Sequence, residues 1–511
     1  MKNTEHINSR DSYTQSPWQV ADVESISKAD TDFPPTYDVI IVGAGITGIT
    51  TALMLQKAGK QCVVIEAGTV GYGTTGGTTA HLNTFFDATY AAIETDFGEE
   101  AAKLTASSGK ESFAMIKDFI DLYHIECDFE YKGAYLFSET EKETKQLTEL
   151  LEATRKAGIN VIEYQDNGVP VPFQKAIHFI DQGQFHPLKY TYALTSEFVK
   201  LGGVILENSF VEETKSENYG HIAKIGNQSL VAKSLVWATH VPPGITPFSF
   251  SCAPYRSYVL GIKLKNDAYP TGLSYDMQEP YHYFRTHEIK GQKYLIVGGE
   301  DHKTGHEDPK RAFENLEAYA NKYYRVESVS YRWSSQYYVP VDGLPYIGLL
   351  TGSDNTYVAT GFNGNGMIFG TLSAKIISDQ ILDVENKYAD LYSPLRIKPI
   401  AGFSEFIKEN ADFVWHFVAD RFGAEELESL KDLQREKGII VELQGEKVAI
   451  YKDENGKVTA LSPICTHAGC TLAFNDAEKS WDCPCHGGRF DINGKVLTGP
   501  PTKNLVQIQI E

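Results

Sequence analysis

The sequence predicts a Rossmann-like α/β domain followed by a small all-β domain at the C-terminus. A buried strand, a glycine-rich turn, a helix and a second strand between residues 37 and 66 indicate the first domain. Short strands at 438–443, 447–451 and 458–461, next to two loops that carry cysteine and histidine, indicate the second. A chain of 511 residues is long enough for about two or three hydrophobic cores.

Composition argues against several classes of function. A formal charge of -20 and a pI near 5.2 disfavour nucleic acid or an anionic membrane surface as a partner, because both select basic patches. The longest apolar runs, such as residues 39–42, are far shorter than a membrane span. Residues 1–35 are polar and lack the apolar core of a signal peptide. We therefore expect a cytoplasmic protein with no integral membrane segment.

The N-terminal arm, residues 1–35, carries no motif and is expected to lie on the fold as an extended lead-in. After it, the strand at 37–42 runs into the turn Gly43-Ala-Gly45-Ile-Thr-Gly48, and the next strand ends in Glu66. In such a unit the three glycines permit a tight turn, a close approach of the backbone to a pyrophosphate, and close packing of helix on sheet. The helix N-terminus faces the phosphates, and Glu66 is placed to accept hydrogen bonds from ribose hydroxyls.

Two later segments extend this predicted dinucleotide site. Residues 71–81 form a loop rich in glycine and threonine, with many N–H and hydroxyl donors, where we expect a bulky ligand. A second unit of strand, glycine turn and helix spans residues 356–381, with the turn at 361–366. Its helix N-terminus is free to face an anionic or carbonyl-bearing group.

Together these features resemble the D-amino-acid oxidase and glycine oxidase family of FAD enzymes. The matching elements are the fingerprint, the glycine loop, Trp237-Ala-Thr239, residues 342–348 and residues 361–366. The resemblance covers about residues 36–390 and implies an α/β FAD-binding domain with an antiparallel-sheet substrate domain. It implies that FAD is bound by Gly43, Gly45, Ile46, Thr47, Gly48, Glu66, Gly73, Thr74, Thr75, Val211, Thr239, Gly361, Gly364, Gly366 and Met367.

The substrate domain is expected at about residues 85–175, which are helical in pattern, and 250–335, which are strand-like. In the family an Arg near the 281–285 strand holds a substrate carboxylate, so Arg285 is the candidate catalytic residue; the alternative is an Arg on an exposed strand face. Aromatic residues are dense in this strand, and sheet packing explains them as well as a substrate cage does. His81 is expected to make an ordinary loop contact, with a direct or covalent contact to the flavin as the alternative.

Near the C-terminus, Cys465-Thr-His467 and Cys483-Pro-Cys-His486 supply two Cys-plus-His pairs. Such ligands suit either zinc or a mixed-ligand iron-sulfur cluster. A gap of one residue between Cys465 and His467 is awkward for chelating a single ion, so the spacing favours ligands that serve two irons. The other cysteines, Cys62, Cys127 and Cys252, are expected to be buried thiols.

These loops, with Gly499-Pro-Pro501, resemble the Rieske domain of respiratory and photosynthetic cytochrome complexes. The resemblance implies that Cys465 and Cys483 bind one iron, that His467 and His486 bind the other, and that Cys470 and Cys485 form a disulfide. High-potential members place Ser and Tyr hydroxyls near the cluster sulfurs, where this chain has Gly488 and Phe490. We therefore predict a potential in the lower part of the roughly -150 to +300 mV Rieske range.

Three other patterns in the sequence have more than one interpretation. Glu279, His282 and His287 have the spacing of a mononuclear iron site, but Pro280 and the alternating aromatics indicate a strand instead of a ligand-bearing helix. His302 and His306, in a charged segment, are expected to be exposed. Residues 403–422 have the apolar spacing of an amphipathic helix, either a linker or a helix that docks on a membrane or partner.

The expected organisation is thus an N-terminal arm (1–35), an FAD-dependent oxidoreductase domain (36–395), a linker helix (396–425) and a Rieske [2Fe-2S] domain (426–511). FAD takes two electrons and a [2Fe-2S] cluster carries one. We expect FAD-dependent oxidation of an amine or amino-acid-like small molecule, with electrons passed through the cluster to an external acceptor. The alternatives are a redox-sensing or electron-transfer protein without an organic substrate, and a reductase that feeds a partner.

Overall fold

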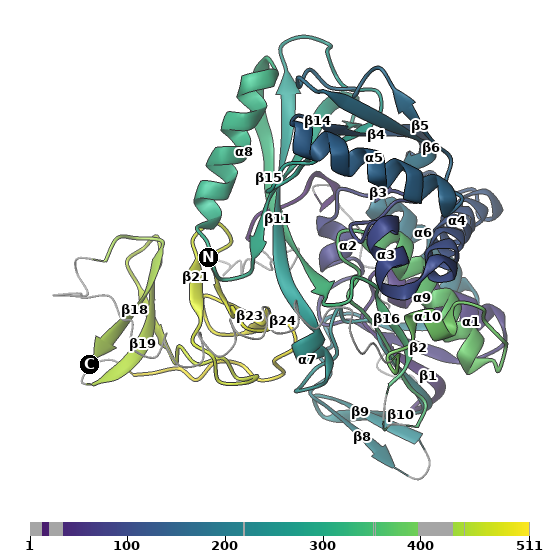
Figure 1. Cartoon of the computed structure of the whole chain (residues 1–511). Coiled ribbons are helices and arrows are strands. Elements are labelled where there is room, and N and C mark those ends of the chain that lie inside the picture. Colours follow the sequence, from purple (N-terminus) through teal and green to yellow (C-terminus); the bar gives the residue numbers. More distant parts are fainter. Residues whose placement is uncertain are drawn as a thin grey trace.

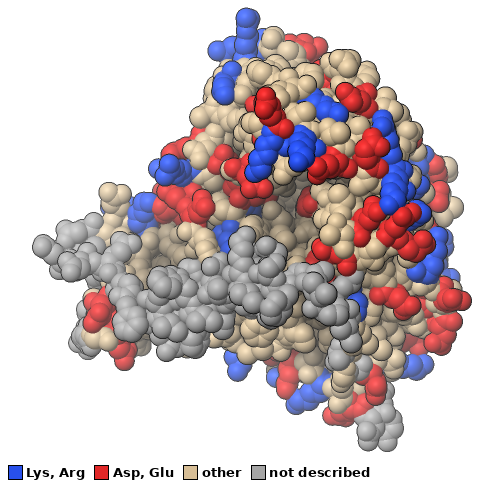
Figure 2. Space-filling view, in the orientation of Figure 1, with Lys and Arg blue, Asp and Glu red and all other residues tan. Residues whose placement is uncertain are grey.

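The structure, a computed structural model, describes residues 13–19, 34–217, 220–350, 352, 354–396, 433–443 and 445–509. The long N-terminal part forms one large body, and the C-terminal strands stand beside it, against the lower ends of two long strands, β11 and β15 (Figure 1). Acidic and basic side chains are interspersed over the described part of the face shown in Figure 2. The arrangement confirms the predicted fold class of an α/β body with an antiparallel sheet and a separate all-β part.

The first sheet has eight strands and is mainly parallel. Its strands are β16 (Tyr346–Leu349), β17 (Thr356–Thr360), β10 (Gln228–Trp237), β1 (Thr36–Val42), β2 (Cys62–Ile65) and β7 (Val204–Leu206), in that order, with β8 (Glu213–Glu217) and β9 (Gly220–Ile225) beside β10. The central strands β1 and β2 are almost wholly buried, as expected of a parallel sheet covered on both faces. Helix α1 (Ile46–Lys57) packs against α6 (Pro187–Lys200) and α9 (Gly366–Ile381).

The second sheet has nine strands and is mainly antiparallel. Its strands are β15 (Val326–Pro340), β11 (Cys252–Leu264), β14 (Gln292–Lys303), β13 (His282–Ile289), β12 (Leu273–Asp276), β4 (Glu130–Ser138), β6 (Lys175–Gln184) and β3 (His81–Leu82), in that order, with β5 (Val161–Tyr164) beside β6. The remaining helices of the large body are η1 (Pro17–Gln19), α2 (Thr74–Gly77), α3 (Tyr90–Phe97), α4 (Glu99–Leu122), α5 (Glu141–Lys156), α7 (Phe248–Ser251), α8 (Pro309–Tyr323) and α10 (Ala389–Tyr392). Helix α5 begins with a capping box in which Thr140 and Glu143 satisfy each other's backbone N–H groups.

The C-terminal part is built of two small antiparallel sheets. One contains β18 (Lys437–Leu443), β19 (Glu446–Lys452) and β20 (Val458–Leu461), and the other β21 (Ala473–Asn475), β22 (Ser480–Asp482), β23 (Arg489–Asp491) and β24 (Val496–Thr498). The cysteine and histidine loops join β20 to β21 and β22 to β23. The amphipathic helix predicted at 403–422 lies outside the described residues. Within the described part of the chain, no helix is long and apolar enough to cross a membrane.

Candidate active site and metal centre

The turn between β1 and α1 allows very close backbone approaches. Gly43 has φ +105°, and a Cβ there would lie 2.4 Å from the carbonyl oxygen of Ala238. A Cβ on Gly48 would lie 1.9 Å from the carbonyl oxygen of Gly43, so only glycine lets the helix sit this close to the strand. The first turn of α1 therefore directs its free N–H groups into the space in front of the sheet, as an anion-binding helix end requires.

Glu66, at the end of β2, braces this turn. Its carboxylate accepts hydrogen bonds from the backbone N–H groups of Ala44 (2.7 Å) and Gly68 (2.8 Å). Burial raises the pKa of Glu66, against the effect of these two hydrogen bonds. Each carboxylate oxygen retains a second lone pair, so the side chain can still accept from ribose hydroxyls.

A cavity of about 830 Å³ opens in front of this turn. Of the residues predicted to bind FAD, all but Gly48 and Gly361 line it, and Gly48 instead has the helix-packing role described above. Thr75 lies beside the turn, since its hydroxyl accepts a hydrogen bond from the N–H of Ile46 at 3.1 Å. A volume of this size, a phosphate cradle and an acid at the end of β2 together fit a dinucleotide.

The antiparallel sheet forms the opposite wall of the cavity. Three of its strands, or the segments that lead into them, contribute lining residues from one face: Ser257, Val259, Tyr281, Tyr283, Ser335 and Tyr337. His81 also lines the cavity, where its Nδ1 is hydrogen-bonded to the hydroxyl of Tyr275. Burial lowers the pKa of His81, with a smaller effect from Arg285.

Arg285 does not line the cavity, and the structure does not support the expectation that it holds a substrate carboxylate. Its guanidinium is fully buried and donates to the carbonyl oxygens of Thr79 and Ala80 and to Nδ1 of His287 at 2.7 Å. Trp18, from the N-terminal arm, covers the guanidinium at 5.5 Å. Burial lowers the pKa of Arg285 to about 9. The residue fastens the glycine loop to β13.

The histidines of β13 do not form a metal site. His282 donates from Nδ1 to Oδ2 of Asp276 at 2.8 Å and stacks on Tyr319, whereas His287 contacts Arg285. An odd spacing of five residues along a strand places these two rings on opposite faces. His302, expected to be exposed, is buried, because it stacks on Tyr258 with ring centroids 5.1 Å apart.

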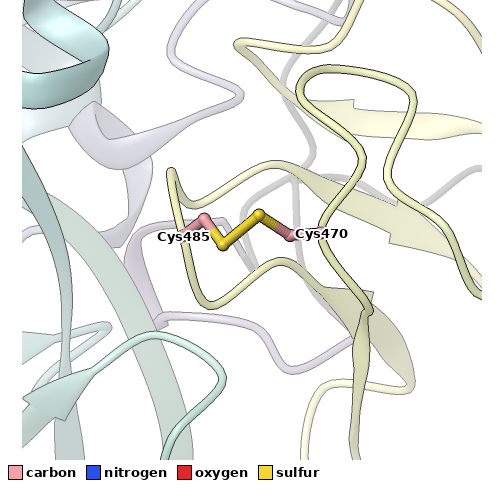
Figure 3. Close-up of a disulfide and its surroundings, with 2 residues drawn as sticks. All are labelled: Cys470 and Cys485. Carbon is pink, nitrogen blue, oxygen red and sulfur yellow. A yellow bond between two sulfur atoms is a disulfide. The ribbon is translucent and has the colours of Figure 1, made fainter. Parts of the chain in front are cut away.

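The cysteine and histidine loops converge on one point. The structure joins Cys470 to Cys485 in a disulfide that ties the two loops together (Figure 3). Cys465 and Cys483 are buried side by side, and the hydrogen bond from Cys465 lowers the pKa of the Cys483 thiol. The rings of His467 and His486 lie 4.8 Å apart.

This donor set fits a [2Fe-2S] cluster with one iron on sulfur and the other on nitrogen, because the thiols form one pair and the imidazoles another. His467 keeps its Nδ1 buried without a hydrogen-bond partner, while its Nε2 bonds the carbonyl oxygen of Gly244 at 3.1 Å. Burial lowers the pKa of His467, and burial with His467 nearby lowers that of His486 to about 3. Both rings are therefore held neutral, which is the form that binds metal.

The positions of the absent hydroxyl donors are closely packed. A Cβ on Gly488 would lie 2.7 Å from Cδ of Pro501 and 3.6 Å from Sγ of Cys465. Pro501 therefore fills the space that a larger residue at position 488 would need. Phe490 is fully buried in the same apolar cluster as Cys465.

Sequence reasoning missed the residues that join the cavity to these loops. Gln336, which lines the cavity, donates from Nε2 to the carbonyl oxygen of Gly487 at 2.9 Å, and Thr304 orients its amide by donating to Oε1 at 3.0 Å. Tyr338 donates to the carbonyl oxygen of His486 at 3.2 Å. The only signal for these residues in the sequence was the run of polar and aromatic residues at 334–338. This run did not indicate which part of the chain they would contact. Residues 496–499, 501 and 502 complete the cavity wall from the C-terminal side.

Comparison with known proteins agrees with both halves of this arrangement. A model of the FAD dependent oxidoreductase family matches residues 38–380, and a model of the Rieske [2Fe-2S] domain matches residues 426–509. The chain is 32% identical over 500 residues to the putative Rieske 2Fe-2S iron-sulfur protein YhfW of Bacillus subtilis (strain 168), a match that covers 96% of this chain and 98% of the relative.

Two further relatives resemble the N-terminal part. Gamma-glutamylputrescine oxidoreductase of Escherichia coli (strain K12) is 22% identical over 384 residues, covering 72% of this chain and 88% of the relative. The crystal structure of glycine oxidase from Geobacillus kaustophilus superposes with a TM-score of 0.60 at 19% identity, covering 71% of this chain and all of that chain. The second comparison establishes a shared fold.

Proposed function

The chain belongs to the FAD dependent oxidoreductase family and ends in a Rieske [2Fe-2S] domain, and from this premise we propose that it oxidises an amine or amino-acid-like substrate and passes the electrons one at a time through the cluster to an external acceptor. FAD, when bound, accepts a hydride equivalent, and the [2Fe-2S] cluster carries single electrons. The FAD part corresponds to residues 36–395 and the cluster part to residues 426–511.

The residues divide into two binding groups. The glycines of the first turn, Glu66, the loop at 73–75, Val211, Thr239 and the turn at 361–367 hold FAD, with the N-terminus of α1 toward the pyrophosphate. Cys465 and Cys483 hold one iron, and His467 and His486 hold the other. Orientation by the cavity walls and exclusion of water are the contributions of the chain to the oxidation step.

One observation carries the proposal: the loop with the proposed ligands Cys483 and His486 is hydrogen-bonded to the wall of the cavity. Gln336 lies at this wall and reaches Gly487, and Tyr338 reaches His486. A cluster that served only an unrelated site would not need these contacts. The arrangement supports a direct route for electrons from the flavin side of the cavity to the ligand loop.

The test is anaerobic mixing of the holoprotein with a panel of amines and amino acids, with flavin absorbance and the electron paramagnetic resonance signal of the reduced cluster recorded together. Both should respond to a productive substrate. Cys483→Ser should retain flavin bleaching and lose the cluster signal and turnover with a one-electron acceptor. Cys127→Ser, which changes a buried thiol outside the cluster loops, should behave as wild type.

Three outcomes would contradict the proposal. If no member of the panel bleaches the flavin, the alternative of an electron-transfer protein without an organic substrate is favoured. If NADH bleaches it rapidly, the chain is a reductase. Flavin bleaching without any cluster reduction in the wild-type protein would remove the proposed electron route.

A further inference from the structure

The charges that line the cavity are all of one sign. Among the described residues, its walls contain the carboxylates of Glu66, Asp87, Glu149, Asp276 and Glu279 and no lysine or arginine. A substrate carboxylate in this space would be desolvated and repelled, with no cation of the chain to pair with it. A cationic substrate would instead be attracted.

Three tyrosine rings lie on the sheet wall of the cavity, and one of them is hydrogen-bonded to a carboxylate behind the wall. Tyr337 donates to Oδ2 of Asp301 at 2.8 Å, and the other carboxylate oxygen, Oδ1, is buried without a hydrogen-bond partner. Tyr281 and Tyr283 lie with their rings 5.8 Å apart, and the Tyr283 hydroxyl bonds that of Ser257 at 3.0 Å. We refer to Tyr281, Tyr283, Tyr337 and Asp301 as the tyrosine cage. Tyrosine faces backed by a carboxylate suit a desolvated ammonium group.

Asp87 also lines the cavity, next to the turn proposed to contact the flavin. Its Oδ2 accepts a hydrogen bond from the N–H of Gly364, in the turn proposed to contact the flavin, at 2.6 Å. Burial raises the pKa of Asp301 to about 6, the hydrogen bonds to its carboxylate oppose this rise, and the charge of Asp87 adds to it. The charge of Asp87 therefore reaches the cage. A cation placed between the two carboxylates would relieve this repulsion and satisfy the unpartnered oxygen.

We propose that the substrate is an aliphatic amine bound as its cation, with the nitrogen between the tyrosine cage and Asp87, and that it carries no carboxylate on the carbon that is oxidised. This inference rests on the proposed function and narrows it from amines and amino acids to cationic amines. Oxidation of the bound cation would transfer one hydride from its C–H bond to FAD and one proton from its N–H bond to water. Water would then hydrolyse the resulting iminium ion to a carbonyl compound and ammonium, or to methylammonium where the substrate is dimethylamine.

The experiment compares pairs of compounds that differ only by a carboxylate: 1,4-diaminobutane with ornithine, and dimethylamine with sarcosine. Anaerobic flavin reduction of the holoenzyme should be at least about tenfold more efficient for the amine of each pair. Tetramethylammonium, which cannot be oxidised by this reaction, should perturb the spectrum of the oxidised flavin by binding in the cage.

Asp301→Asn should weaken tetramethylammonium binding about tenfold to a hundredfold, because it removes the charge and keeps the shape. Glu300→Gln is the matched control: it removes the same charge one residue earlier on β14, where the side chain bonds Asn315 and points away from the cavity. It should bind tetramethylammonium as wild type.

The outcomes separate the two proposals. Equal or faster flavin reduction by the amino acid of each pair, or equal binding by Asp301→Asn and Glu300→Gln, would overturn the cationic-amine inference while leaving the proposed function in place. Flavin reduction by none of the compounds, with tetramethylammonium binding intact, would overturn the proposed function and leave the cage as a cation site. Failure of tetramethylammonium to bind the wild-type holoenzyme would overturn the cage itself.

Discussion

Tyr338→Phe is the most direct test of the contact between the cavity wall and the cluster loop. The Tyr338 hydroxyl donates to the carbonyl oxygen of His486 at 3.2 Å, with that of Gly499 at 3.4 Å as a second acceptor, and accepts from Gln336 at 3.2 Å. Burial raises the pKa of Tyr338, so the hydroxyl stays protonated and remains a donor near neutral pH.

The substitution removes one donated and one accepted hydrogen bond without changing the ring. Each such bond contributes about 0.5–1.5 kcal/mol, so the docked arrangement should lose about 1–3 kcal/mol. At about 1.36 kcal/mol for each factor of ten, a loss of this size changes an equilibrium about fivefold to 160-fold. In stopped-flow mixing with a productive substrate, flavin bleaching should keep its wild-type rate while cluster reduction slows by a comparable factor.

Tyr324→Phe is the matched control, because Tyr324 is also buried and its hydroxyl has no hydrogen-bond partner. Its removal should leave cluster reduction unchanged and should be neutral or stabilising in thermal unfolding. Wild-type cluster reduction in Tyr338→Phe, or the same slowing in both variants, would refute the view that this hydroxyl holds the ligand loop against the cavity.

Three further predictions follow from single features. Gly48→Ala places a Cβ 1.9 Å from a carbonyl oxygen and should abolish FAD retention, measured as the flavin-to-protein absorbance ratio, whereas Gly59→Ala, with no atom within 4 Å, should retain it. Because the pKa of Asp301 is raised to about 6, tetramethylammonium affinity should rise with pH through that value as the carboxylate ionises; the raised pKa of Asp87 adds to this dependence, and Asp301→Asn should weaken it. Because the pKa of Asp301 is raised in the folded protein, its ionisation lowers the free energy of unfolding as the pH rises from about 4 to about 6. Redox titration should give a cluster midpoint in the lower part of the roughly -150 to +300 mV range, raised in Phe490→Tyr; a midpoint near the top in the wild-type protein would contradict the argument from missing donors.

The parts that the sequence predicted well depend on residues close together in the chain. The contact between Gly43 and Gly48 arises within one turn, so spacing alone carries the information. The disulfide between Cys470 and Cys485 was expected from the resemblance of two short loops to those of Rieske domains. Local spacing could not predict the role of Arg285. Strand alternation places Arg285 on the same face as Tyr281 and Tyr283. Its guanidinium is instead covered by Trp18, which comes from the distant N-terminal arm, and Arg285 does not line the cavity.

Asp301 was missed for a related reason. The pairing of β11 with β14 shifts register between Arg256 and Tyr258, next to Glu300, which has φ +57°. Such an irregularity changes which face a strand residue occupies, and simple alternation does not reveal it. The charge of the whole cavity is likewise a property of several distant segments brought together by folding, so no local pattern could predict the absence of lysine and arginine from its described walls.

The cavity and the cluster loops share one segment of the chain, and this constrains how the two parts can work. Pro501 lines the cavity on one side and packs against the position of Gly488, beside Cys465, on the other. Gly244, in the large body, bonds two loops of the C-terminal part, since its N–H donates to the carbonyl oxygen of Pro500 and its own carbonyl oxygen accepts from His467. Separation of the C-terminal part would therefore open the cavity to water and withdraw the proposed ligands at the same time. In the proposed function, substrate oxidation and electron transfer to the cluster would therefore depend on the same docked arrangement.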